Sequence, residues 1–451
     1  MCSVGMRAEQ PTRFDSPLNC MTRLYYLSRT IEVRRKGSPI AITPRVSGLE
    51  ALDIDLTEAD AGFANELSGW LDDHLGGYLD RLAKDSDPVA RRQLAREWQA
   101  EMARGRWAAI GWPTEFGGRA ATSRQQLIFY LASAERRVPP LAGGVGINLC
   151  GPTLIAHGTP QQQQRYLRPM LDGREVWCQG FSEPGAGSDL ASLRTRAVID
   201  GSDLVVTGQK VWTSGAQDSD WMFALVRTDA DAPKRKGISF VLIPMAADGV
   251  DVRPIRQISG DSGFSEVFLD SVRVPIDNVV GGLNQGWDVT RTTLANERAI
   301  VFMGQQAALT STLRKIIKQA KIADVLGDRP ADDPHLRDRI AQAWIDVELI
   351  QLNGMRNLAK VLSGHVPGPE GSMSKLFGQH TEQAVHELAL DIGGSYSILD
   401  RGAQDAPNNG KWALGWLRTR GSSIGGGTSE IQRNVLAERV LGQPRDPWAD
   451  A

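Results

Sequence analysis

The sequence predicts an α+β protein, mostly α, with an N-terminal helical domain, a middle antiparallel β domain and a C-terminal four-helix bundle. Three observations support this fold class. The 451 residues are enough for two or three domains with buried cores. Apolar residues recur at helical spacing before about residue 175 and after about residue 284, and at every second position between these points. We therefore expect a leader at 1–50, a helical domain at 51–175, a β domain at 176–283 and a helical bundle at 284–445.

Composition excludes several classes of protein. The formal net charge of −2 and the pI near 6.4 give no reason to expect binding to nucleic acid or to an anionic membrane. No apolar run in the sequence approaches membrane-spanning length. The four cysteines form no C-x-x-C pair, which favours a reduced, cytoplasmic chain. The six histidines are scattered without the spacing of metal ligands, so no metal site is predicted.

The segment 1–50 is rich in arginine and lysine and shows neither helical nor strand periodicity. Organelle presequences are also arginine-rich and acid-poor, but they form amphipathic helices, and no such pattern occurs here. The favoured interpretation is a disordered leader that is not part of the fold. A presequence and a translation start assigned too far upstream are the alternatives.

The first domain is expected to be helical. An apolar rhythm with helical spacing begins at Leu56, and the Thr57 hydroxyl is suited to cap its first turn. A proline and three glycines make Gly111–Gly118 a rigid loop between helices. Further helices are predicted at about 89–104, 123–137 and 161–171.

The second domain is expected to be a compact barrel or sandwich, with strands at about 176–180, 195–199, 204–210, 221–227, 238–244, 250–255 and 265–274. Asp200-Gly201 separates two alternating apolar segments, which is a strong hairpin signal. This hairpin is expected to bring two polar loops together, Ser182–Asp189 and Trp212–Gly215. Their glycines permit close backbone approach to a ligand and their hydroxyls supply hydrogen bonds. The two loops therefore suit a planar, polar cofactor.

The third domain is expected to be a bundle of long antiparallel helices, because helical periodicity returns with apolar stripes of the width that bundle packing requires. The polar, glycine-rich connections at 364–371 and 402–410 are predicted to be exposed loops. The helices are expected at about 287–321, 334–361, 373–392 and 428–441.

Five segments in this order resemble the acyl-CoA dehydrogenase family over about Asp55 to Arg445. They are GWPTEFGG (Gly111–Gly118), FSEPGAGSD (Phe181–Asp189), GQKVWTS (Gly208–Ser214), GWDVTRTTLANER (Gly286–Arg298) and GGGTSEIQRN (Gly425–Asn434). The resemblance implies an FAD-dependent oxidoreductase that converts an acyl-CoA to its 2,3-enoyl form, by α-proton abstraction and hydride transfer to flavin N5. It also implies a tetramer, a role in fatty acid or lipid catabolism such as β-oxidation, and electron transfer to an electron-transfer flavoprotein.

The resemblance also assigns site residues by match to the family's motifs. Ser182 matches a hydroxyl at the pyrimidine edge of the flavin, and Ser214 matches one that approaches flavin N5. Ser188 matches a contact with the CoA pantetheine, and the expected substrate-binding residues are Ser188, Leu294 and Arg298. The expected cofactor-binding residues are Gln179, Phe181, Ser182, Gly187, Ser188, Trp212, Ser214, Thr428 and Glu430.

The position of the catalytic base departs from a common family pattern. Many members carry the base just before the Gly-Thr of the last motif, where this chain has Gly426. A minority branch places a glutamate on the helix after the β domain, which corresponds to Glu297. Apolar neighbours at Glu297 favour a raised pKa, as a general base near neutral pH requires. We expect Glu297 to be the base, with Glu430 as the alternative, and the Gly426 backbone N–H to bind the thioester carbonyl.

Two further features leave alternatives open. The three glycines at 425–427 leave space for a bulky or branched acyl group. The family motifs that bind the flavin pyrophosphate across a subunit boundary are absent, and Lys321, Arg329 or a non-identical subunit are the candidate replacements. The protein could therefore be a homo- or hetero-oligomer. A flavin-poor, non-catalytic subunit of a heteromeric dehydrogenase and an acyl-CoA oxidase are the rival functions.

Overall fold

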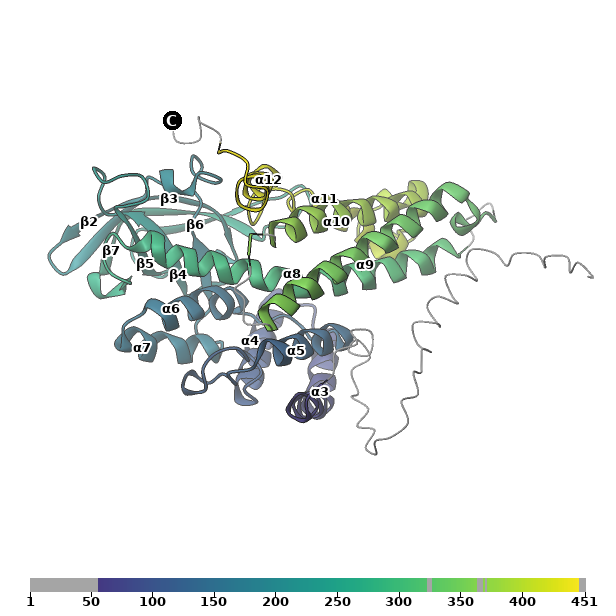
Figure 1. Ribbon diagram of the computed structural model, residues 1–451, viewed down its shortest axis with the longest axis horizontal. Coiled ribbons are helices and arrows are strands. Elements are labelled where there is room, and N and C mark those ends of the chain that lie inside the picture. Colours follow the sequence, from purple (N-terminus) through teal and green to yellow (C-terminus); the bar gives the residue numbers. More distant parts are fainter. Residues whose placement is uncertain (1–55, 323–326, 363–367, 370, 446–451) are drawn as a thin grey trace, which may run out of the picture.

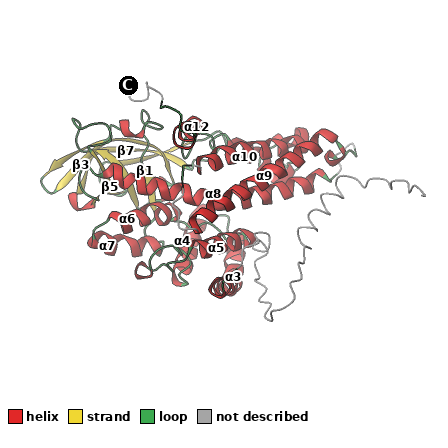
Figure 2. Ribbon diagram, in the orientation of Figure 1, coloured by secondary structure: helices red, strands yellow, loops and turns green. Residues whose placement is uncertain are grey.

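A computed structural model describes residues 56–322, 327–362, 368–369 and 371–445 of the chain; within α8 and α9, the side chains of 296–307, 355, 358–359 and 361–362 lie outside the description. The predicted leader at 1–50 also lies outside it. The predicted fold class is confirmed: helices of the N-terminal part, a β domain and a set of long C-terminal helices follow one another (Figures 1 and 2).

The N-terminal part consists of helices that pack around a tryptophan-rich core. Threonine side chains start three of them with reciprocal capping boxes, at Thr57, Thr122 and Thr159, so the expected cap at Thr57 is confirmed. Trp98 and Trp107 lie fully inside the core. The helices are α3 (Glu58–Lys84), α4 (Pro88–Arg104), α5 (Ser123–Arg136), α6 (Gly151–His157) and α7 (Pro160–Leu171), with a π-helical turn at Gly146–Cys150 directly before α6.

The β domain is one sheet with the strand order β6-β7-β3-β2-β4-β5-β8, and β1 pairs with β4 outside this path. The strands are β1 (Trp177–Gly180), β2 (Arg196–Asp200), β3 (Asp203–Ser214), β4 (Trp221–Arg227), β5 (Ile238–Pro244), β6 (Val250–Ile255), β7 (Phe264–Pro275) and β8 (Val279–Val280). The sheet is mostly antiparallel, but β1 and β4 are parallel, and β2 meets β4 in a parallel bridge. A wholly antiparallel domain was therefore an over-simplification, because strands separated by a long connection can pair in either direction.

The C-terminal part contains three long helices and two shorter ones. These are α8 (Gly286–Ala320), α9 (Pro334–Leu362), α10 (Gly371–Gly393), α11 (Lys411–Thr419) and α12 (Ser429–Val435), the last continued by a π-helical turn at Leu436–Val440. Leu313, Ile316, Val347 and Leu388 are among the buried residues that join α8, α9 and α10. Helix α11, which covers this core with Trp412, was not predicted from the sequence. Helix α8 runs from the β domain into the bundle, so it links the two (Figure 1).

Short 3-10 turns occupy several connections: Thr114–Phe116, Leu190–Ser192, Ala216–Asp218, Ile276–Asn278, Pro330–Asp332, Gly394–Ile398 and Pro407–Gly410. The helices of the described ranges include none that is both long and apolar enough to cross a membrane.

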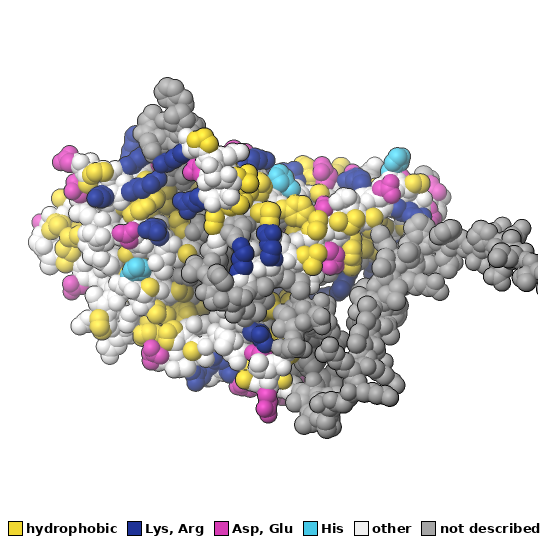
Figure 3. Space-filling view, viewed as in Figure 1, with side chains coloured by type: hydrophobic (Ala, Val, Ile, Leu, Met, Phe, Trp, Pro, Cys, Tyr) yellow, Lys and Arg dark blue, Asp and Glu magenta, His cyan; other side chains and the backbone are white. Residues whose placement is uncertain are grey.

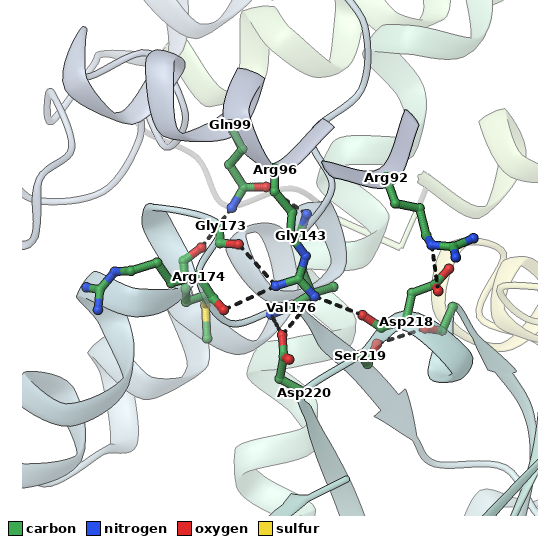
Figure 4. Close-up of polar contacts among 12 residues, drawn as sticks. Arg92, Arg96, Gln99, Gly143, Gly173, Arg174, Val176, Asp218, Ser219 and Asp220 are labelled. Atoms are coloured by element: carbon green, nitrogen blue, oxygen red, sulfur yellow. Dashed lines mark hydrogen bonds and ion pairs between the residues drawn. The ribbon is translucent and has the colours of Figure 1, made fainter. Parts of the chain in front are cut away.

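Arg96 on α4 fastens the N-terminal helices to the β domain (Figure 4). Its guanidinium donates to the carbonyls of Arg174 and Asp218 at 3.1 and 3.2 Å, and to the Asp220 carboxylate at 3.1 Å. The same carboxylate accepts the N–H of Val176 at 2.7 Å. Charge-assisted bonds of this kind are stronger than neutral ones, so one arginine fixes the α7–β1 connection against the start of β4.

Candidate active site

An irregularity in β3 sets the direction of the second polar loop, Trp212–Gly215. Leu204, Val206 and Lys210 share one face of the strand and point into the protein. The register with β7 then shifts between Lys210 and Thr213, and Trp212 adopts a left-handed φ of 60°. Because one extra residue reverses the alternation, Thr213 is buried and the side chain of Trp212 becomes 59% exposed.

The first polar loop, Ser182–Asp189, lies directly beside this β-bulge. It begins where β1 ends, and the Val211 N–H donates to the carbonyl of Ser182 at 2.9 Å. Ser182 is half-buried and Ser214 is exposed. The Asp200–Asp203 hairpin between the loops pairs β2 with β3 as expected. The sequence prediction that this hairpin brings the two loops together is confirmed by these contacts.

A buried ion pair lies under the two loops. Lys210 Nζ is 2.8 Å from Glu183 Oε1, and the two side chains are 0% and 8% exposed. Burial lowers the pKa of Lys210 to about 8, although the carboxylate partly offsets this. Burial also raises the pKa of Glu183, but Lys210 and hydrogen bonds outweigh it, so the carboxyl pKa is lowered and the group is ionised at neutral pH.

Aromatic rings of the sheet pack against the start of the first loop. Phe181 is buried and contacts Phe223 and Phe240 edge to face, with ring centroids 5.7 and 6.0 Å apart. Phe223 and Phe240 belong to the paired strands β4 and β5 and stack on each other. Phe181 is therefore an anchor that holds the end of β1 against the sheet.

Helix α8 begins against the same strands. A Cβ added at Gly286 would lie 2.5 Å from the carbonyl carbon of Ser239 and 2.6 Å from the nitrogen of Phe240. Only glycine allows the helix backbone to approach β5 this closely. On the other side, Thr293 and Thr292 bond to Thr153 and His157 of α6 at 2.9 and 2.7 Å. The first two turns of α8 are therefore fixed between the β domain and α6.

The C-terminal loop that contains Gly426 is held by α10. Lys375 donates to the carbonyl of Ser422, and Gln379 donates to the Ser429 hydroxyl, both at 2.5 Å. Gly426 and Gly427 have positive φ values of 64° and 90°, a conformation that residues with a side chain rarely adopt. The backbone conformation of this loop therefore gives an independent reason for a glycine at position 426.

This loop is also connected to the second polar loop. Arg418 at the end of α11 forms an ion pair with Asp261 in the β6–β7 connection. Within the same connection, the carbonyl of Gly263 accepts the N–H of Gly215 at 3.1 Å. The segment after Ser214 and the segment before Gly426 are thus linked through residues 261–263.

The remaining predicted residues differ in their exposure and contacts. Thr428 is the N-cap of α12, and its oxygen accepts the N–H of Ile431 at 3.2 Å, which leaves the hydroxyl hydrogen available for another group. Glu430 is exposed and pairs with Arg433. Leu294 is half-buried on α8, Gly187 and Ser188 are exposed, and Gln179 is half-buried on β1. The backbones of Glu297 and Arg298 belong to α8, but their side chains lie outside the described residues.

The roles of Glu183, Lys210 and Arg96 were not predicted from the sequence. Lys210 carried a usable signal, because it occupies the same strand face as Leu204 and Val206, and a buried lysine requires a partner. Nothing in the spacing identified Glu183 as that partner. Arg96 carried no signal, because it is one of several arginines on α4 and its acceptors come from distant segments.

Comparison with known proteins decides the family. Models of the acyl-CoA dehydrogenase N-terminal, middle and C-terminal domains match residues 70–174, 178–272 and 284–441. The chain belongs to the acyl-CoA dehydrogenase family. It is therefore an enzyme of a flavin-dependent oxidoreductase family.

Individual relatives agree with this assignment. The acyl-CoA dehydrogenase IpdE1 of Mycobacterium tuberculosis is 38% identical over 394 residues, which cover 85% of this chain and 98% of the relative. The ChsE4–ChsE5 complex of Mycobacterium tuberculosis contains a chain with a TM-score of 0.74 and 32% identity, covering 87% of this chain and all of that one. A chain of the "Tcur3481-Tcur3483 steroid ACAD" has a TM-score of 0.73, 28% identity and the same coverage.

Proposed function

We propose that this acyl-CoA dehydrogenase catalyses the FAD-dependent 2,3-dehydrogenation of a bulky, ring-bearing acyl-CoA. The observation that carries the proposal is the meeting of the two polar loops, which the Val211–Ser182 bond joins at the bulge of β3. Ser182, Trp212 and Ser214 then lie on neighbouring segments at one end of the sheet.

The chemistry of these residues fits a flavin. The hydroxyls of Ser182 and Ser214 and the indole N–H of Trp212 have no hydrogen-bond partner within the described ranges, so they are free to bind a ligand. A flavin ring requires several hydrogen bonds at its edge and apolar cover on its faces. Gln179, Thr428 and the Trp212 indole complete such a set. Bound FAD would supply the acceptor for the hydride that leaves the β-carbon of the substrate.

The residues of the chain would perform the proton chemistry. We assign Glu297 as the base that removes the α-proton of the thioester. Gly426 is exposed, and its N–H has no acceptor among the residues described, so the N–H is available to bind the thioester carbonyl and to stabilise the negative charge that develops on its oxygen. This division of roles rests on the match to the family's motifs and on the absence of a carboxylate at position 426.

Two observations support a bulky acyl group. The loop at 425–427 has no side chains, and the φ values of Gly426 and Gly427 disfavour any replacement that would fill the space. The similar structure of the "Tcur3481-Tcur3483 steroid ACAD" points in the same direction. Ser188, Leu294 and Arg298 are the proposed substrate contacts, with Ser188 facing the CoA.

We also propose that the enzyme acts as an oligomer in the cytoplasm and passes its electrons to an electron-transfer flavoprotein. Hydrophobic side chains gather over the bundle in the view of Figure 3. On α9, Ile345, Leu349 and Leu352 are 50%, 46% and 58% exposed. Such an apolar helix face supports a subunit contact. Arg329, a candidate replacement for the absent pyrophosphate motif, is already paired with Asp332 at 2.8 Å. A hetero-oligomer whose other subunit completes the flavin site is in keeping with the similar ChsE4–ChsE5 complex.

The function is tested with purified protein and a panel of acyl-CoAs with straight, branched and ring-bearing chains, using an artificial electron acceptor. We expect flavin absorbance, preference for ring-bearing substrates, and loss of turnover by at least about a hundredfold in Glu297→Gln. Glu387→Gln, an exposed carboxylate of α10, is the matched control and should retain wild-type turnover.

Three results would contradict the proposal. Near-normal turnover in Glu297→Gln would refute the assignment of the base. A colourless protein that remains inactive after addition of FAD would favour the flavin-poor subunit, and stoichiometric peroxide would favour the oxidase. Faster turnover of short straight-chain substrates would refute the proposed acyl group.

A further inference from the structure

The ion pair between Lys210 and Glu183 is unusual because charged side chains are rarely buried this completely. Lys210 is 0% exposed, and its ammonium also donates to the carbonyl of Phe181 at 3.1 Å. Buried ion pairs are weak sources of stability, since desolvation offsets their attraction. An explanation other than simple stabilisation is therefore needed.

The pair joins three segments that are distant in the sequence. The Glu183 carboxylate accepts the N–H groups of Arg194 and Thr195, at 2.6 and 2.9 Å, just before β2. Its other contact is Lys210, on β3 immediately before the bulge. Every one of these contacts involves a charged group, and they fix the first loop, the entry to the hairpin and the end of β3 relative to one another.

The proposed flavin contacts lie beside these anchor points. Ser182 stands between Phe181, whose carbonyl binds Lys210, and Glu183, whose carboxylate binds it. Trp212 and Ser214 follow Lys210 across the bulge, where the left-handed φ of Trp212 turns both side chains outward. A small change in the position of the Lys210 ammonium would therefore move both loops at once.

We propose that Lys210 and Glu183 are positioning residues that set the geometry of the two cofactor-binding loops, and through it the affinity and reduction potential of the bound flavin. This inference rests on the proposed function. Neither side chain needs to touch the flavin, because their effect is transmitted through Ser182 and through the backbone at Val211.

The test compares the wild type with Lys210→Met, Glu183→Gln and the double variant, each stripped of flavin and titrated with FAD. We expect each single variant to bind FAD more weakly by about tenfold or more, with a changed visible spectrum and a shifted midpoint potential. The double variant has no unpaired buried charge and should regain stability against urea, but not FAD affinity.

Two further variants separate positioning from general stability. Glu183→Asp keeps the negative charge but places the carboxylate further from Lys210. It should therefore lose less FAD affinity than Glu183→Gln. It also serves as the test variant if the neutral variants do not fold. Arg124→Met breaks the ion pair with Asp60, a carboxylate that is 7% exposed in the N-terminal helical part. This control should lower resistance to urea and leave FAD affinity, spectrum and potential unchanged.

The outcomes distinguish a failure of the proposed function from a failure of this inference. A wild type that takes up no FAD would overturn the proposed function and this inference together. If the wild type binds FAD, single variants within about twofold of its affinity and with its potential would overturn the inference alone. Recovery of affinity and potential in the double variant would also overturn it, because charge balance would then be the whole role of the pair.

Discussion

Replacing Gly286 by alanine tests how far the site depends on the seating of α8. The new Cβ would lie 2.5 Å from the Ser239 carbonyl carbon, whereas ordinary contacts begin near 3.4 Å. The obstructing atoms are backbone atoms of β5, which is paired with β4 at this point, so α8 must retreat by about 0.9 Å. We expect a loss of about 1–3 kcal/mol in the free energy of unfolding, as in other overpacked cores. Turnover should fall by about a hundredfold, since reacting groups misplaced by about 1 Å lose this much.

The assays are urea unfolding and turnover of the preferred acyl-CoA with saturating FAD. Gly76→Ala on α3 is the matched control, because its Cβ meets nothing within 4 Å. The exchange also lowers the backbone entropy of the unfolded chain. It should leave turnover unchanged and raise stability by up to about 1 kcal/mol. Wild-type turnover and stability in Gly286→Ala would show that β5 yields easily and that α8 does not need this close approach.

Two further predictions concern charges. Because the pKa of Lys210 is about 8 in the folded protein and near 10.5 for an ordinary lysine, the unfolded chain binds more protons between these values. The free energy of unfolding of the wild type should therefore rise relative to that of Lys210→Met between pH 8 and 10, and a pH-independent difference in urea unfolding would contradict the burial of the ammonium. Arg96→Met should cost about 2–3 kcal/mol in the same assay, because it removes charge-assisted bonds at the domain junction. Arg92→Met, which breaks only the exposed pair with Asp218, should cost less than about 1 kcal/mol, and equal losses would show that Arg96 has no special role.

The spacing of apolar residues in the sequence was sufficient to predict most of the fold. The strands 221–227, 238–244 and 250–255 have the predicted bounds, because each ends at a local change of pattern. The extension of β3 to Ser214 was not predictable, since the bulge interrupts the alternation that identifies a strand. The parallel pairing of β1 with β4 has no local signal, and a short helix such as α11 is difficult to separate from the glycine-rich loop before it.

The meeting of the two polar loops was predictable, but the contacts that support them were not. The hairpin at Asp200-Gly201 was enough to predict that the loops of Ser182 and Ser214 meet. The side chains that fix these loops come from elsewhere: Glu183 binds the start of β2, and Arg418 reaches Asp261 from α11. Such contacts depend on tertiary geometry, which spacing along the chain does not contain. The assignment of Glu297 as the base stays a prediction.

The long-range pairing of β3 also has a consequence for how the protein is made. Of the strands that the structure describes, only β7 pairs with residues 208–214 of β3, and Ser214 meets Phe264 about 50 positions later in the chain. At about 5–20 residues per second, a ribosome needs roughly 3–10 s to synthesise that interval. During this time the Trp212 segment has no strand to complete it. The two polar loops are therefore expected to close late, and the proposed flavin site can form only after β7 has been synthesised.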